Sequence, residues 1–208
     1  MKIAHIAFAA AALFMGAAHA AVFENNEGVN TNVFPFGSPD TTSYGQVFGL
    51  DSKQTVIDWT FYTNSGAAGD LSFVLAAWDG DKPVGPAIYK TNLSFAGGLQ
   101  DLFVANINQT LEAGKYIAYM TVAGIAQPVS NVVFAGSKED GGLVGGFRFL
   151  NSGGVDPLTL DKPWLTYTVP NLLYKANIVA APVPEPEALA MLLAGLAGVG
   201  VFARRRQA

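Results

Sequence analysis

The residues that could do chemistry in this chain are mainly carboxylates, because histidine and cysteine are nearly absent. The 208 residues include no cysteine and two histidines, His5 and His19. Both histidines fall in an N-terminal segment that we expect to be removed, which leaves segment 21–180 with neither residue type. Ser-His-Asp and Cys-His catalysis, thiol redox chemistry and zinc or copper sites built on these ligands are thereby excluded from that segment.

None of the acidic residues stands in a pattern typical of a site. Asp70, Asp79 and Asp81 could offer oxygen ligands to calcium, but Asp79-Gly80-Asp81 lacks the longer acidic series of a calcium loop and is typical of a solvated turn. Two carboxylates could hydrolyse a glycosidic bond, yet Asp58 lies between apolar residues on an expected strand, where it would face solvent. We predict no catalytic residue, no metal site, no cofactor and no enzymatic activity.

The tryptophans are candidate glycan contacts, because exposed aromatic rings stack on the apolar faces of sugars. Trp59 alternates in step with neighbouring apolar residues and is expected in the core. Trp78 stands next to a turn, and Trp164 follows a proline at an expected strand start. If the domain is a carbohydrate-binding module, Trp78 and Trp164 are its predicted binding residues; burial in the core is the alternative for both.

The charge of segment 21–180 argues against nucleic acid as a partner. Its eight basic residues are outnumbered by fourteen acidic ones, so the segment carries a net charge of about −6. The basic residues are scattered singly and form no stripe that could neutralise phosphates.

The elements that position these residues are expected to be strands. Apolar and polar residues alternate with period two over 57–62, 71–78 and 116–123, which predicts half-buried strands. Further strands are expected at 44–50, 86–95, 101–107, 131–136, 144–150, 164–169 and 172–179. Glycine-rich turns separate them, and no window sustains a helical period. About 160 residues with this spacing predict a single antiparallel β-sandwich, jelly-roll-like in form.

The N-terminal segment 1–20 has the features of a secretory signal peptide. One lysine is followed by a short apolar stretch, and Ala18 and Ala20 supply small residues before Ala21. We expect cleavage after Ala20; an uncleaved N-terminal membrane anchor is the alternative.

The C-terminal segment combines three features in a fixed order. A proline-rich stalk at 181–187 includes Pro184, Glu185 and Pro186, sixteen uncharged residues follow at 188–203, and Arg204, Arg205 and Arg206 begin the tail at 204–208. Sixteen helical residues span roughly 24 Å, and arginine side chains can extend to the membrane surface. A transmembrane helix with a cytoplasmic arginine tail and the domain outside is expected.

This order of stalk, apolar helix and arginine cluster resembles the PEP-CTERM sorting signal of Gram-negative bacteria. The resemblance implies that Pro184-Glu185-Pro186 is recognised by exosortase, a membrane-embedded, cysteine-dependent processing enzyme, and that the three arginines stop translocation. An ordinary tail anchor with a proline-rich stalk is the alternative. Ala77-Trp78-Asp79-Gly80, with Gly85-Pro86 after it, is similar to β-sandwich domains that precede such tails.

These features together predict an exported protein that is transiently anchored in the membrane. By the resemblance, its destination is the cell surface or an exopolysaccharide-rich matrix, where it would act as a structural or adhesive component of a biofilm. The expected partners are exosortase, the membrane and extracellular polysaccharide. A carbohydrate-binding module is the alternative function, and a glycoside hydrolase is the third.

Overall fold

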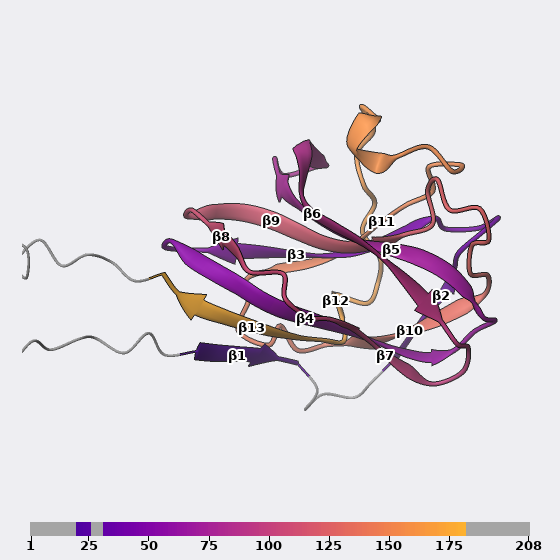
Figure 1. Ribbon diagram of the computed structural model, residues 1–208, viewed down its shortest axis with the longest axis horizontal. Helices are drawn as coiled ribbons and strands as arrows, with labels where there is room; N and C mark the ends of the chain where they lie inside the picture. The colour runs from indigo at the N-terminus through magenta and orange to yellow at the C-terminus, as the bar shows by residue number, and fades with distance from the viewer. Residues whose placement is uncertain (1–19, 26–30, 182–208) are drawn as a thin grey trace, which may run out of the picture. The chain divides into compact units, whose positions relative to one another are not determined.

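The computed structural model describes residues 20–25 and 31–181, which form two antiparallel β-sheets packed face to face (Figure 1). The predicted all-β sandwich is therefore confirmed, and the described residues include no α-helix, only the short 3₁₀ turn η1 (Pro157–Thr159). The strands are β1 (Ala20–Glu24), β2 (Thr31–Phe36), β3 (Ser43–Leu50), β4 (Gln54–Ser65), β5 (Gly69–Trp78), β6 (Pro83–Phe95), β7 (Gln100–Val104), β8 (Gln109–Leu111), β9 (Gly114–Thr121), β10 (Val132–Ser137), β11 (Gly145–Leu150), β12 (Asn171–Leu172) and β13 (Tyr174–Ala180).

The larger sheet has eight strands and is organised around β4. Its order is β1-β13-β4-β10-β12, while β2 pairs with β10, and β7 and β8 pair with β4. The smaller sheet has five strands in the order β11-β3-β9-β5-β6. Consecutive strands such as β3, β4 and β5 alternate between the two sheets, so the turns between them lie at the two ends of the sandwich.

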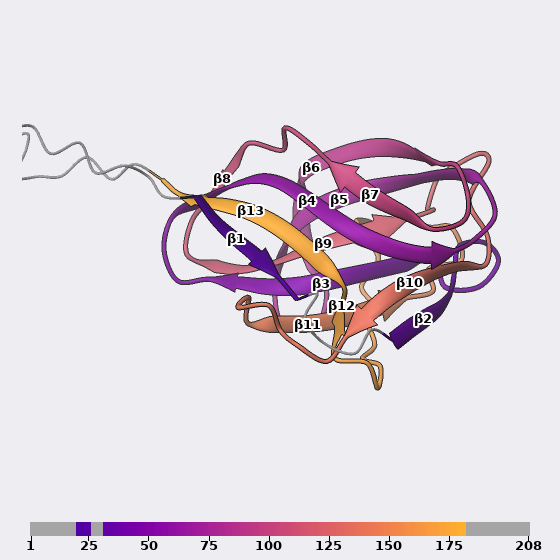
Figure 2. The ribbon, with the colours of Figure 1, turned by 90° about the horizontal axis from the view of Figure 1, so that it is seen from below.

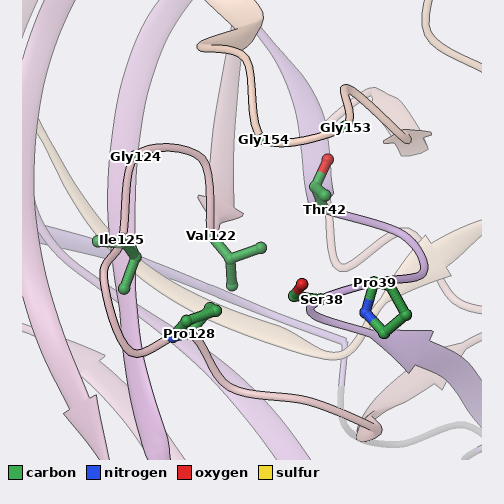
Figure 3. Close-up of a pocket in the computed structure, with 9 residues that line it drawn as sticks. All are labelled: Ser38, Pro39, Thr42, Val122, Gly124, Ile125, Pro128, Gly153 and Gly154. Atoms are coloured by element: carbon green, nitrogen blue, oxygen red, sulfur yellow. The ribbon is translucent and has the colours of Figure 1, made fainter.

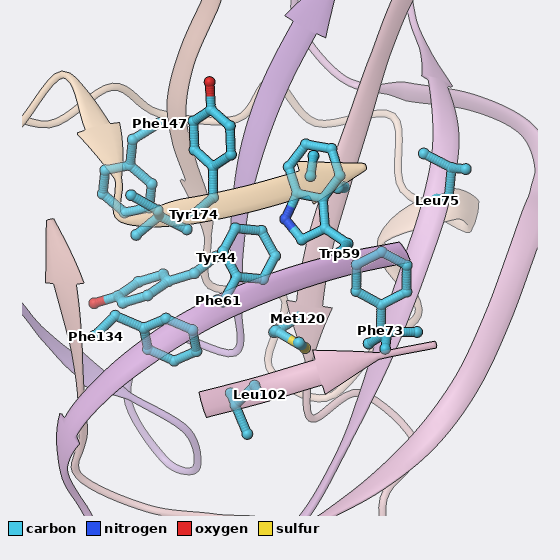
Figure 4. Packing of buried hydrophobic residues seen from close by; sticks show 14 of the residues in the cluster. Tyr44, Trp59, Phe61, Phe73, Leu75, Leu102, Met120, Phe134, Phe147 and Tyr174 are labelled. Atoms are coloured by element: carbon cyan, nitrogen blue, oxygen red, sulfur yellow. The ribbon is translucent and has the colours of Figure 1, made fainter. Parts of the chain in front are cut away.

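The core between the sheets is built from aromatic rings at the inward positions of the strands (Figure 4). Trp59 and Phe61 of β4 are fully buried, as their alternation predicts. Trp59 stacks on Tyr174 of β13 with ring centroids 5.4 Å apart. Because burying a side chain of this size stabilises the fold by roughly 1.5–3 kcal/mol, this aromatic layer contributes strongly to holding the sheets together.

The outer faces of the two sheets differ in what covers them. On the smaller sheet, a second apolar cluster that includes Val74, Trp78 and Tyr119 lies beneath segment 151–166, with Leu158 and Leu160 packed against it. Most outward positions of the larger sheet instead carry exposed or half-buried side chains along β1, β13, β4 and β7. The two faces therefore offer different surfaces to solvent.

The start of β1 and the end of β13 lie at the same end of the sandwich (Figure 2). Ala20 pairs with Val179 across β1 and β13, and the Ala181 N–H donates to the Lys53 carbonyl in the β3–β4 turn, at 3.2 Å. The loops at 37–42, 122–131 and 151–156 gather at the other end, where β3 begins and β9 and β11 end.

The expected strand at 164–169 is wrong. Leu165 forms only an isolated bridge with Phe149, and the Trp164 N–H donates to the Asp81 carbonyl at 2.8 Å, so this backbone pairs with a turn. Prolines at 163 and 170 remove two donors that a strand would need. The strand expected at 101–107 ends at Val104, and the sequence does not predict β1, β2 or β8.

Candidate functional site

Both candidate glycan-binding tryptophans are buried: Trp78 lies under segment 151–166, and Trp164, which belongs to that segment, packs inward against Trp78. Trp78 is 6% exposed and Trp164 is 5% exposed. Their rings meet edge to face with centroids 6.1 Å apart, and Trp164 meets Tyr119 in the same way at 5.2 Å. The structure therefore brings the two predicted residues together, but neither ring presents an open face to a sugar. Burial, the alternative weighed for both tryptophans, is what the structure shows. The periodicity of a strand gives no information about a loop that folds over it.

Segment 151–166 is fixed to the smaller sheet by specific bonds. The Asp156 carboxylate accepts from the Leu158 N–H at 3.0 Å and caps the η1 turn. Lys82 forms an ion pair with Asp161, and the Trp164 backbone bonds to the turn after β5. The cluster leaves two buried polar atoms, Trp164 Nε1 and Tyr119 Oη, without a hydrogen-bond partner among the described residues. Burial raises the pKa of Tyr119 far above its usual value, and Asp156 adds to this.

Two adjoining hollows lie among the loops at the end of the sandwich opposite Ala20 and Ala181. Figure 3 shows the residues that line the larger one. Their volumes are about 510 and 280 Å³, and Gly124, Ile125 and Gly154 line both. The larger is lined by Ser38, Pro39, Thr42, Val122, Gly124, Ile125, Pro128, Gly153 and Gly154. The smaller is lined by Ser72, Lys90, Asn92, Ala123, Gly124, Ile125, Gly154 and Asp156.

Local backbone geometry positions the loops around the larger hollow. Gly37 has φ +115°, and a Cβ there would stand 2.2 Å from the Val129 carbonyl oxygen, so only glycine fits this close approach. Thr42 ties the β2–β3 loop to the end of β11, because its Oγ1 donates to the Leu150 carbonyl at 3.2 Å and accepts from the Ser152 N–H at 2.8 Å.

The hollows offer hydroxyl, amide and backbone groups more than acid–base chemistry. Their lining includes one carboxylate, Asp156, which lies 3.9 Å from the Lys90 ammonium. The Ser72 hydroxyl donates to Asn92 Oδ1 at 2.7 Å. Two carboxyl groups across a substrate, the requirement for most glycoside hydrolases, are not supplied by these linings.

The acidic residues weighed as calcium ligands do not converge. Asp79 Oδ1 accepts from the backbone N–H groups of Asp81 and Lys82, each at 2.9 Å, and these bonds lower the pKa of Asp79. Asp70 lies at the opposite end of β5, where it accepts from the Ser94 hydroxyl at 2.7 Å. Within 20–25 and 31–181, no three acidic or histidine side chains are grouped as metal ligands.

Sequence reasoning missed the aromatic residues that do reach the surface of the larger sheet. Phe103 of β7 is 54% exposed, and Tyr62 of β4 is half-buried on the same outer face. The signal was present in the run Asp101-Leu102-Phe103-Val104, where a phenylalanine occupies a position that alternation assigns to solvent.

The family profile of the PEP-CTERM protein-sorting motif matches residues 182–207, which follow Ala181 directly. The chain therefore carries a PEP-CTERM protein-sorting motif. The motif includes Pro184, Glu185 and Pro186 as well as Arg204, Arg205 and Arg206, all of which lie outside the described residues. As the sequence predicts, this is an exported protein that exosortase processes and that is directed to the surface or the extracellular space.

Other predictions for the ends of this chain also fall outside the described residues. They concern the signal peptide, of which residues 1–19 with Ala18 are not described, and the apolar stretch 188–203. Ala20 and Ala21, on either side of the expected cleavage, lie in β1. In the part of the chain that the structure describes, no helix has the length and apolar character needed to cross a membrane.

No curated protein matches this chain. Among solved structures, a clostridial cysteine protease, Cwp84, after propeptide cleavage is similar with a TM-score of 0.49 and 13% identity, over 78% of this chain and 40% of the other. The infectious bursal disease virus VP2 subviral particle is similar with a TM-score of 0.26 and 10% sequence identity, over 82% of this chain and 43% of the other. The structure of the Gx strain of that virus is similar with a TM-score of 0.28 and 8% sequence identity, over 93% of this chain and 54% of the other. The chain thus spans about half or less of the length of these proteins.

Proposed function

We propose that the exported sandwich is a non-enzymatic structural or adhesive component of the cell surface or of an exopolysaccharide-rich matrix. The observation that carries the proposal is the PEP-CTERM motif at 182–207, placed directly after a domain without histidine or cysteine. The signal peptide accounts for export, and processing by exosortase accounts for release from the membrane. A domain that uses no thiol and no metal-binding histidine suits an environment without cellular reductants or chaperones.

The distribution of carboxylates supports a role other than hydrolysis. The two hollows have Asp156 as their one lining carboxylate, and a lysine ammonium stands beside it. Asp58, which the sequence places on a strand, accepts a hydrogen bond from Asn177 Nδ2 at 2.8 Å on the outer face of the larger sheet. This carboxylate therefore lies on a sheet face and does not line either hollow.

The experiment that tests the proposal follows the protein in its own host. We expect mass spectrometry of the surface and matrix fractions to find a protein that begins at Ala21 and has lost Arg204–Arg206. Replacing Pro184, Glu185 and Pro186 together by alanine should retain the unprocessed form in the membrane. Recovery of the arginine-bearing form in the matrix, or of the wild-type protein in the membrane alone, would contradict the proposal.

A second assay tests the absence of activity. The processed protein is incubated with the host's exopolysaccharide, and the length distribution of the polymer is followed by size-exclusion chromatography. We expect no change. Shortening of the polymer that disappears on replacing one carboxylate, Asp156 or Asp58, would establish a hydrolase instead.

The alternative function, a carbohydrate-binding module, is favoured by one observation. Phe103 and Tyr62 lie on the open face of the larger sheet, whereas Trp78 and Trp164 do not reach the surface. If glycans are bound, Phe103 and Tyr62 are better placed to contact them than Trp78 and Trp164.

A further inference from the structure

The outer face of the larger sheet brings four neighbouring strands into register. Glu24 of β1 lies opposite Lys175 of β13, Lys175 lies opposite Thr60 of β4, and Thr60 lies opposite Phe103 of β7. Three spacings between neighbouring strands make this row roughly 14 Å wide. The row is an extended surface and not a pocket.

Two aromatic side chains stand at the β7 side of this row. Phe103 is 54% exposed, while Leu102 and Val104 on either side of it are each 2% exposed and belong to the core. Tyr62 is one outward position further along β4, opposite Asp101. Phe103 and Tyr62 are therefore diagonal neighbours, about 7–8 Å apart between their Cα atoms. Neither ring packs against another aromatic ring within the described ranges.

Polar groups that can bind hydroxyls surround the two rings. The Lys175 ammonium lies 3.7 Å from a Glu24 carboxylate oxygen. Thr60 lies between the rings and this ion pair, but it is buried, with only 7% of its surface exposed. Asp101 stands across from Tyr62. Burial, then Glu24 and Asp101, raise the pKa of Tyr62, so its hydroxyl stays protonated at neutral pH and can both donate and accept.

The charges of this face select against an anionic ligand. Glu24, Asp58 and Asp101 supply three carboxylates at these outward positions, and Lys175 supplies one ammonium. An acidic polysaccharide or a phosphate-bearing lipid surface would meet repulsion here. A neutral sugar polymer would meet no such penalty, since its hydroxyls can donate to the carboxylates and its apolar ring faces can cover Phe103 and Tyr62.

From this arrangement we infer that the outer face of β1, β13, β4 and β7 binds an uncharged polysaccharide, with Phe103 and Tyr62 stacking on sugar rings. The inference rests on the proposed function, because it names the ligand class of a matrix component. It places the binding site away from the buried tryptophans and away from the two hollows.

The test measures retardation of the processed protein in native gels that contain a dissolved polymer. The probes are hydroxyethylcellulose and dextran, which are uncharged, alginate, which is anionic, and the host's own exopolysaccharide. We expect retardation by at least one uncharged polymer. Phe103→Ala and Tyr62→Ala should each weaken this interaction by about tenfold, the loss typical of a central contact residue. Phe103→Trp should retain it.

Tyr167→Ala is the matched control, because Tyr167 is 51% exposed and lies by β11 against Phe149. It should bind as the wild type does, and thermal melting checks that every variant is folded. Retardation by alginate alone, by no polymer, or equally in Phe103→Ala and wild type would overturn the inference. Matrix localisation is measured independently, so these results leave the proposed function intact, whereas a protein that binds polymers but stays out of the matrix would refute the proposed function alone.

Discussion

Tyr119 allows a direct test of how the smaller sheet is covered. Its ring is fully buried beneath segment 151–166, edge to face with Trp164, and its hydroxyl has no hydrogen-bond partner among the described residues. Replacing it by phenylalanine removes the hydroxyl and keeps the ring. The Tyr119→Phe variant should therefore be more stable than the wild type.

The expected gain follows from the cost of burying an unpaired polar group, about 1–3 kcal/mol. Because the ring contacts remain, we expect Tyr119→Phe to raise the free energy of unfolding by about 1 kcal/mol, near the lower end of that range. Tyr174→Phe is the contrasting variant, since the Tyr174 hydroxyl donates to the Asp140 carbonyl. It should lose about 1 kcal/mol, the net worth of one hydrogen bond. The two variants should thus differ by about 2 kcal/mol.

Urea unfolding of the processed protein, followed by tryptophan fluorescence, measures these differences. Both variants should keep the slope of the wild type, so that the shift in midpoint reports stability alone. If Tyr119→Phe proves less stable than the wild type, the hydroxyl has a partner, and the account of a sealed apolar cluster under segment 151–166 is wrong.

Three further predictions concern packing, pH and backbone. Trp164→Ala should lower the free energy of unfolding by about 3–5 kcal/mol, the usual cost of deleting a buried large aromatic ring, while leaving polysaccharide retardation per folded molecule unchanged; urea titration and affinity gels check the two parts. Burial raises the pKa of Tyr44 from 10.0 to about 12, so the folded state holds this proton more tightly than the unfolded state does. The contribution of this group to stability is therefore fully present below pH 10, and the free energy of unfolding should fall from there towards pH 12. Unfolding titrations on Tyr44→Phe should show a shallower fall over this range than those on the wild type. Gly145→Ala should prevent stable folding or lower the melting temperature sharply, since its Cβ would stand 1.8 Å from the Val47 carbonyl oxygen. Gly49→Ala should melt close to the wild type, because its Cβ would stand 3.5 Å from the Val144 carbonyl oxygen, an ordinary contact distance.

The strands could be predicted where alternation is long and regular. Trp59 and Phe61 alternate with polar residues, and β4 buries both because a half-buried strand has to place them on one side. The order of the strands and the pairing of β1 with β13 could not be predicted, because pairing between residues distant in sequence leaves no local pattern.

The candidate site was predictable only in part. Trp164 follows a proline and resembles a strand start. Its environment is set instead by the Asp81 carbonyl, which is distant in sequence, and by the irregular segment around η1. Phe103 lies inside an expected strand. Its exposure follows from alternation, because Leu102 and Val104 on either side of it face the core. The information on Phe103 was local, whereas the information on Trp164 was not.

The position of β13 has a mechanical consequence. This strand ends one residue before Ala181, which continues into the sorting motif, so tension applied through the motif enters the domain along β13. β13 is not an edge strand: it is hydrogen-bonded to β4 over its whole length and to β1 over most of it. Tension along β13 loads both ladders in shear, and their hydrogen bonds have to yield together, whereas an edge strand can be peeled away one bond at a time. Forced unfolding is governed by the unfolding rate. A domain pulled in this way should therefore resist forced unfolding better than one pulled through an edge strand.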